Sequence, residues 1–265
     1  MSRIKTCFAA CKKDGRTALI PFITAGDPNR SVTLKLMHAM VKAGADIIEL
    51  GVPFSDPMAD GPTIQRSSER ALKYGTSLRD VLEIVAEFRS QDNTTPVVLM
   101  GYLNPIESMG YRYFVESAEI AGVDGVLTVD LPPEEGAEFE QLCEQHNIDP
   151  IYLIAPTTTE KRIEKISRSA RGFIYYVSVK GVTGGEVPDF SEVSKNVDMI
   201  RSKSPLPVGV GFGIKDAQSA ATVGEFADAV VIGSVLVNKM EELQDNPEQI
   251  PDVISGIISN IHSSL

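Results

Sequence analysis

The chain has 265 residues, of which 43% are hydrophobic, and a formal net charge of −11. This length allows one large core and is close to the roughly 250 residues of an eight-fold β/α barrel, so we expect one catalytic domain over residues 1–265. The negative charge argues against a nucleic-acid or anionic membrane partner, because both would repel it. Neither a spanning apolar run nor an export signal is evident, so the cytoplasm is the expected compartment.

In chain order, residues 2–13 predict a helix that would close one end of a barrel. After it, short apolar runs rich in β-branched residues alternate with polar turns and segments of helical periodicity. The runs predict eight strands, at residues 17–24, 47–50, 96–101, 125–129, 150–154, 173–177, 207–211 and 229–232. The intervening segments predict helices that include residues 31–43, 78–89, 111–121, 134–146, 159–168 and 216–223, with a last helix at 251–261.

Strands that are apolar throughout and separated by helices are typical of a parallel sheet covered on both faces. Eight such units favour an α/β fold, a single-domain (β/α)8 TIM barrel with an extra N-terminal helix. An open doubly wound sheet is the alternative. That fold would need a glycine-rich dinucleotide turn after the first strand, and residues 25–28 (Ala-Gly-Asp-Pro) do not supply one.

Polar residues at the carboxyl ends of the strands form the active site of such a barrel. Glu49 interrupts the apolar run at residues 47–50, so closure would place a carboxylate among inward or interfacial side chains. Burial without a partner would raise its pKa and suit it to general acid–base catalysis. The alternative is a structural glutamate that is paired with a neighbouring donor or turned outward.

The turn after the second strand, residues 51–62, contains three prolines and two aspartates. Asp60 could fold back over the barrel mouth to meet Glu49, and like charges would then hold the two carboxylates in different protonation states. For Asp56 and Asp60 the simpler interpretation is helix capping or turn formation.

Glycines follow the seventh and eighth strands, where barrels hold phosphate. Residues 209–213 read Gly-Val-Gly-Phe-Gly, and Gly233 precedes Ser234 at the expected start of a short helix. Such turns let backbone N–H groups approach an anion, although either alone more often marks a tight turn. The long turn at residues 178–190 is glycine-rich and could close over a ligand or be a disordered surface loop.

Aromatic residues near strand ends could offer apolar surface to a ligand or simply fill the core; these are Phe22, Tyr175 and Phe212. The three cysteines, Cys7, Cys11 and Cys143, lack metal-ligand spacing, so we interpret them as buried thiols and expect no metal site.

The segment from Glu49 to Pro62, ELGVPFSDPMADGP, together with the glycine turns, closely resembles the tryptophan synthase alpha family, and the similarity extends along essentially the whole chain. The resemblance implies a carbon–carbon lyase that cleaves indole-3-glycerol phosphate to indole and glyceraldehyde 3-phosphate by a retro-aldol reaction. It also implies that this chain binds no metal and no cofactor.

The resemblance also implies roles for individual residues. Glu49 would protonate the indole carbon that bears the side chain and help to remove the hydroxyl proton, Asp60 would accept the indole N–H, and Tyr175 would line the reacting end. The remaining positions are Gly184, Gly213, Gly233 and Ser234 for phosphate; Phe22, Met100, Leu127, Thr183 and Phe212 for the indole pocket and lid; and Asp56 and Pro57 for the partner loop.

The implied partner is a beta subunit in an α2β2 assembly that receives indole directly. Two other functions stay open. One is a phosphate-binding barrel isomerase of amino-acid biosynthesis, whose usual acid–base placement does not predict Asp60. The other is a noncatalytic alpha-like activator of a beta subunit, which would have lost Glu49 or Asp60.

Overall fold

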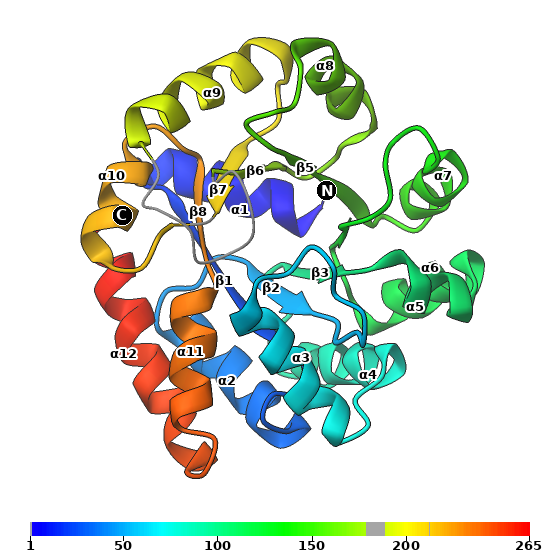
Figure 1. Ribbon diagram of the computed structural model, residues 1–265, viewed down its shortest axis with the longest axis vertical. Coiled ribbons are helices and arrows are strands. Elements are labelled where there is room, and N and C mark those ends of the chain that lie inside the picture. The colour runs from blue at the N-terminus through cyan, green and yellow to red at the C-terminus, as the bar shows by residue number, and fades with distance from the viewer. Residues whose placement is uncertain (1, 179–188, 212) are drawn as a thin grey trace.

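The computed structural model describes residues 2–178, 189–211 and 213–265 and contains a closed barrel of eight parallel strands in chain order (Figure 1). Closure is made by β1 pairing with β8, which excludes the open-sheet alternative. The predicted strands are confirmed to within one residue at each end. They are β1 (Ala18–Thr24), β2 (Ile48–Gly51), β3 (Val97–Gly101), β4 (Gly125–Thr128), β5 (Asp149–Ile154), β6 (Ile174–Val177), β7 (Val208–Gly211) and β8 (Ala229–Ile232).

Most of the helices surround the barrel and cover the outer face of its strands, whereas the N-terminal helix lies across one end of the barrel (Figure 1). They are α1 (Arg3–Asp14), α2 (Arg30–Lys42), α3 (Pro62–Lys73), α4 (Leu78–Arg89), α5 (Leu103–Met109), α6 (Tyr111–Ala121), α7 (Ala137–Gln145), α8 (Glu160–Ser169), α9 (Phe190–Lys203), α10 (Ala217–Gly224), α11 (Ser234–Glu242) and α12 (Ile250–His262), with a short 3-10 turn at Pro247–Gln249. The sequence patterns did not identify α3, α5 and α9. They also began α7 three residues early, because the helix starts only after its N-cap Gly136.

Two apolar layers form the core. On β2, Ile48 and Leu50 face outward into the layer between strands and helices. Residues of the other parity face the barrel axis and form an inner layer, which includes Ile47, Val98 and Leu127. Side chains of α1, among them Ile4 and Phe8, belong to this inner layer. The N-terminal helix therefore closes one end of the barrel, as its sequence position predicted.

Aspartates hold the end of the barrel where the strands begin. Asp46, Asp124 and Asp228 stand just before β2, β4 and β8. Each accepts a backbone N–H near the start of the preceding strand, from Leu19, Val97 and Val208 at 2.9, 2.8 and 2.9 Å. Arginines neutralise all three carboxylates. Because the charges at this end are paired, it serves stability and leaves the carboxyl end of the strands for chemistry.

None of the helices in the described part of the chain is both long and apolar enough to cross a membrane.

Candidate active site

Glu49 lies inside the barrel, near the carboxyl end of β2. Its neighbours Ile48 and Leu50 face the helices, so the alternation of a strand directs Glu49 toward the barrel axis. The residue is 1% exposed, and neither carboxylate oxygen has a hydrogen-bond partner among the described residues. Burial raises the pKa of Glu49 to about 8, because an ionised carboxylate would lose its hydration there. Glu49 is therefore mostly protonated at neutral pH.

Tyr175 on β6 stands near this carboxyl group. Its pKa is raised well above the usual value, first by burial and then by the negative charge of Glu49. The neighbouring strand makes room for the ring at Gly211, where a Cβ atom would lie only 2.6 Å from the Tyr175 Cζ atom. A side chain at position 211 would push the phenol out of place.

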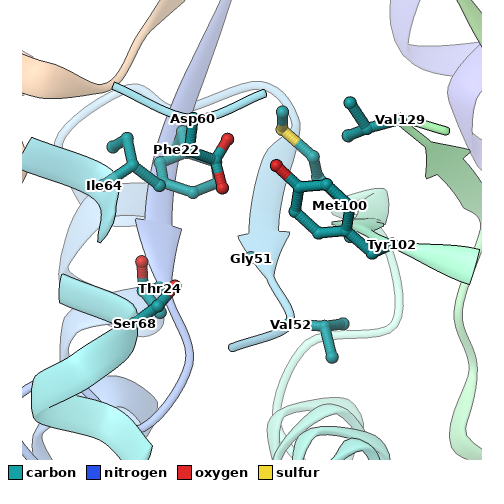
Figure 2. Close-up of a pocket in the computed structure, with 11 residues that line it drawn as sticks. Phe22, Thr24, Gly51, Val52, Asp60, Ile64, Ser68, Met100, Tyr102 and Val129 are labelled. Atoms are coloured by element: carbon teal, nitrogen blue, oxygen red, sulfur yellow. The ribbon is translucent and has the colours of Figure 1, made fainter. Parts of the chain in front are cut away.

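Asp60 stands at the mouth of the barrel, in the segment that joins β2 to α3. It faces a narrow cleft between the ends of β1, β2 and β3 (Figure 2). The cleft is lined by Phe22, Thr24, Gly51, Val52, Asp60, Ile64, Ser68, Met100, Gly101, Tyr102 and Val129. A carboxylate above a mainly apolar pocket can accept a hydrogen bond from a flat apolar ligand that carries one polar N–H group.

Tyr102 positions the Asp60 segment. Its hydroxyl accepts the Ala59 N–H at 2.9 Å, and its ring packs at a tilt against Phe54 with 5.3 Å between centroids. Burial raises the pKa of Asp60 to about 6, and the polar hydroxyl of Tyr102 limits that rise. At pH 7 Asp60 is therefore mostly ionised, whereas Glu49 is mostly protonated.

The physical cause of this difference is not the one that we expected from the sequence. Repulsion between two neighbouring carboxylates was expected to separate their pKa values. In the structure each pKa is raised mainly by loss of solvent, and neither carboxylate contributes to the shift of the other. Glu49 is also absent from the residues that line the cleft around Asp60, and Gly51, two residues further along β2, lines it instead.

Some of the residues predicted for the indole pocket line the cleft, and one is buried in the core. Phe22 and Met100 line the cleft, whereas Leu127 is fully buried in the inner layer of the core. Phe22 is pressed against the backbone, since a Cβ atom at Gly51 would lie 2.7 Å from its ring. Phe212 lies outside the described residues.

The predicted anion site involves the loops after β7 and β8. Gly213 has a φ of 78°, in the left-handed region that favours glycine. Gly233 is the N-cap of α11, and no side chain caps that helix. The first N–H groups of a helix have no partner within it, so those of Ser234 and its neighbour are oriented to bind an anion. Gly184 and Thr183 lie outside the described residues.

Comparisons with known proteins agree with this geometry. The family model described as "Tryptophan synthase alpha chain" matches residues 8–261. The chain belongs to this family.

Two examples show how close the relatives are. A tryptophan synthase alpha chain of Nitrosococcus oceani is 57% identical over all of this chain and 98% of its own length. The crystal structure of tryptophan synthase subunit alpha from Legionella pneumophila is 42% identical and covers all of this chain and 98% of its own, with a TM-score of 0.92.

A third comparison is with an assembly. A chain in the crystal structure of the tryptophan synthase complex from Pyrococcus furiosus is 37% identical, with a TM-score of 0.85, over 94% of this chain and 98% of its own. Together with the family model, these relatives argue against the isomerase alternative.

The loop that the family resemblance assigned to a partner lies at the surface. Asp56 and its neighbour Met58 are exposed, Met58 to 82%, and Pro57 is partly buried. The Asp56 carboxylate accepts the Ser55 hydroxyl at 2.5 Å, and the Asp60 N–H donates to the Pro57 carbonyl at 3.1 Å. The exposed turn is thus joined directly to Asp60.

The thiols differ in part from the prediction. Cys11 and Cys143 are buried, but Cys7 is only partly so. Cys7 and Cys11 share one face of α1, and their sulfur atoms lie within 4.8 Å of each other and of an Asp46 oxygen. Both Asp46 oxygens are already bound to Arg16, and one also accepts the Leu19 N–H. These contacts leave the carboxylate poorly placed to bind a metal ion.

Sequence reasoning missed three polar residues of the cleft, Thr24, Ser68 and Tyr102. The Thr24 hydroxyl is buried and has no partner within the described residues. Thr24 ends β1 and Tyr102 follows β3, so the rule that strand ends carry function could have found both. Ser68 comes from α3, a helix that the sequence patterns did not identify.

Proposed function

We propose that this chain cleaves indole-3-glycerol phosphate to indole and glyceraldehyde 3-phosphate. The observation that carries the proposal is Glu49, a carboxyl group buried inside the barrel without a hydrogen-bond partner among the described residues and with a pKa of about 8. A group that is protonated at neutral pH and can become ionised during turnover is suited to give and then take a proton.

The reaction needs one proton at the ring and releases one from the side chain. Glu49 would donate its proton to the indole carbon that bears the glycerol phosphate chain, leaving positive charge on the ring nitrogen. The Glu49 carboxylate would then take the proton of the adjacent side-chain hydroxyl as the carbon–carbon bond breaks. The electrons of that bond return to the ring, so indole and the aldehyde leave with no net change at Glu49.

Asp60 has the complementary role. With a pKa of about 6 it is mostly ionised at pH 7 and can accept the indole N–H while positive charge develops on the nitrogen. Tyr175 would line the reacting end beside Glu49. Phe22, Met100 and Leu127 would provide the apolar environment of the ring, together with Phe212.

The phosphate group would bind at the same end of the barrel as Asp60, beyond Phe22, on the backbone N–H groups of Gly213, Gly233 and Ser234 and the positive end of α11. Gly184 would complete this cradle, and Thr183 would approach Asp60 when a ligand is bound.

A beta subunit in an α2β2 assembly is the proposed partner, with Asp56 and Pro57 at the contact and the cytoplasm as the compartment. The exposed turn at these residues supports the assignment, because it presents an apolar side chain, Met58, next to the segment that carries Asp60.

The test is release of indole from indole-3-glycerol phosphate by the purified chain, with and without a beta subunit. Glu49→Gln keeps the shape of the side chain and removes the titrating group, while Glu116→Gln changes an exposed glutamate on α6 as the matched control. We expect indole from the parent and the control, and almost none from Glu49→Gln. A parent chain that only activates the beta subunit and releases no indole would identify it as a noncatalytic activator.

A further inference from the structure

The proposed site has two parts, Asp60 and the phosphate cradle. They are connected by a charged contact between α3 and α11, helices that lie side by side in the outer ring (Figure 1). The segment with Asp60 leads directly into α3, and α11 begins at Ser234 in the phosphate cradle. These helices follow β2 and β8, strands far apart in the sequence. A substrate that reaches from Asp60 to the cradle therefore depends on how α3 is placed relative to α11.

Three residues on one face of α3 contact α11. The Arg66 guanidinium donates two hydrogen bonds to the Glu241 carboxylate, at 2.8 and 2.9 Å. Arg70 Nη1 lies 3.1 Å from the same carboxylate, in an ion pair without hydrogen-bond alignment. The Thr63 hydroxyl donates to Asn238 at 3.0 Å. The two arginines thus share one acceptor, Glu241.

Arg70 also anchors α3 to the barrel. Its guanidinium makes a bidentate contact with Asp27, at 2.8 and 2.7 Å, just beyond the end of β1. Asp27 is fully buried and Arg70 is 8% exposed, and the Ser67 hydroxyl donates to Asp27 at 2.6 Å. An ion pair this deep is rigid, because separating the charges would leave one of them buried and unpaired.

The first turn of α3 is hydrogen-bonded to the Asp60 backbone. The Gln65 side-chain amide donates to the Asp60 carbonyl at 2.8 Å. Contacts therefore run without interruption from Asp60 through Gln65 to α3, across Arg66 and Arg70 to Glu241, and along α11 to Ser234.

We propose that Glu241 and Arg70 are positioning residues, which set the distance and angle between Asp60 and the phosphate cradle by fixing α3 against α11. The inference rests on the proposed function, because it takes the ligand to be one that occupies both places. A ligand that binds in only one place gains nothing from this alignment. Ligands that span the site and ligands that do not must therefore respond differently when the contact is lost.

The experiment removes the shared acceptor with Glu241→Ala. Glu241 is 28% exposed at the side chain, so the fold tolerates its loss better than that of buried Arg70. Glu242→Ala is the matched control, since this neighbour on α11 is 62% exposed and its one ion pair within residues 2–178, 189–211 and 213–265 is with Lys239 of its own helix. Binding of three probes is measured by calorimetry on the full chain: inorganic phosphate, indole, and the unreactive indole-3-propanol phosphate, which spans the site.

For Glu241→Ala we expect the affinity for indole-3-propanol phosphate to fall about tenfold, while the affinities for phosphate and for indole stay within about twofold of the parent. The control should match the parent for all three. Equal affinity of parent and Glu241→Ala for the spanning probe would overturn the proposal. So would a parallel loss of phosphate affinity, which would show local damage to the cradle.

Arg70→Lys provides a second measurement. Lysine keeps the charge but not the bidentate geometry, so the spanning probe should again weaken selectively, by about the same factor. Failure of the proposed function has a different signature: the parent itself would show no preference for indole-3-propanol phosphate over phosphate alone.

Discussion

Two buried carboxylates, Asp124 at one end of the barrel and Glu49 at the other, differ in how their charge is compensated. At the end where the strands begin, Asp124 is paired with Arg3 and Arg89 and accepts the Val97 N–H. At the other end Glu49 is equally buried and has no hydrogen-bond partner in the described part of the chain. A buried carboxylate with bonded partners stabilises the fold. A buried carboxylate without partners has a raised pKa, which suits it to proton transfer.

The largest effect should come from removing the unsatisfied group. We expect Glu49→Gln to lower kcat/KM for indole-3-glycerol phosphate about 10²- to 10⁴-fold, because an amide can neither donate nor accept the proton. Steady-state kinetics of indole release measures this. Activity within threefold of the parent would show that Glu49 is not the acid.

At the end where the strands begin, a substitution should lower stability and leave activity nearly unchanged. Asp124→Asn leaves Arg89 buried without its ionic partner, so the free energy of unfolding should fall by about 3 kcal/mol. Urea unfolding at pH 7 measures the loss, and the folded fraction should retain close to parental kcat. A variant as stable as the parent would mean that the paired carboxylate contributes little to this end.

The pH dependence of stability should distinguish the two ends as well. The folded-state pKa of Glu49, about 8, lies above its ordinary value of 4.5, so the native state holds this proton more tightly than the unfolded chain. Stability from this group is present at low pH and is lost as pH rises toward 8.

Glu49→Gln removes that dependence. Between pH 5.5 and 7.5 the parent should lose about 2 to 3 kcal/mol of unfolding free energy relative to the variant. Urea unfolding at both pH values tests this, with Glu116→Gln as a control that should follow the parent. Parallel curves for parent and Glu49→Gln would contradict a raised pKa.

The smallest change in activity is expected for Tyr102→Phe, which acts through the pKa of Asp60. The Tyr102 hydroxyl limits the rise of its pKa, so Tyr102→Phe should raise that pKa above about 6. The proposed mechanism uses Asp60 as the anion, so the acidic limb of the kcat/KM profile should move to higher pH. Activity should then fall severalfold at pH 6 and less at pH 8. An acidic limb that does not move would show that Tyr102 only supports the loop backbone.

The sequence determined the barrel, because buried parallel strands and amphipathic helices each leave a local periodic pattern. All eight strands were located to within a residue, and the segment at residues 49–62 was enough to indicate the family. Glu49 was recognisable because a charged residue in an apolar strand run contradicts the pattern around it. These features depend on residues that are neighbours in the chain.

The tertiary structure alone decided what depends on contacts across the chain. It showed that burial, not mutual repulsion, separates the pKa values of Glu49 and Asp60, and that Tyr102 holds the Asp60 segment. It also brought α3 against α11, although Arg70 and Glu241 are 171 positions apart in the sequence. Solvent exclusion and long-range ion pairs arise only when the barrel closes, so no local pattern could have predicted them.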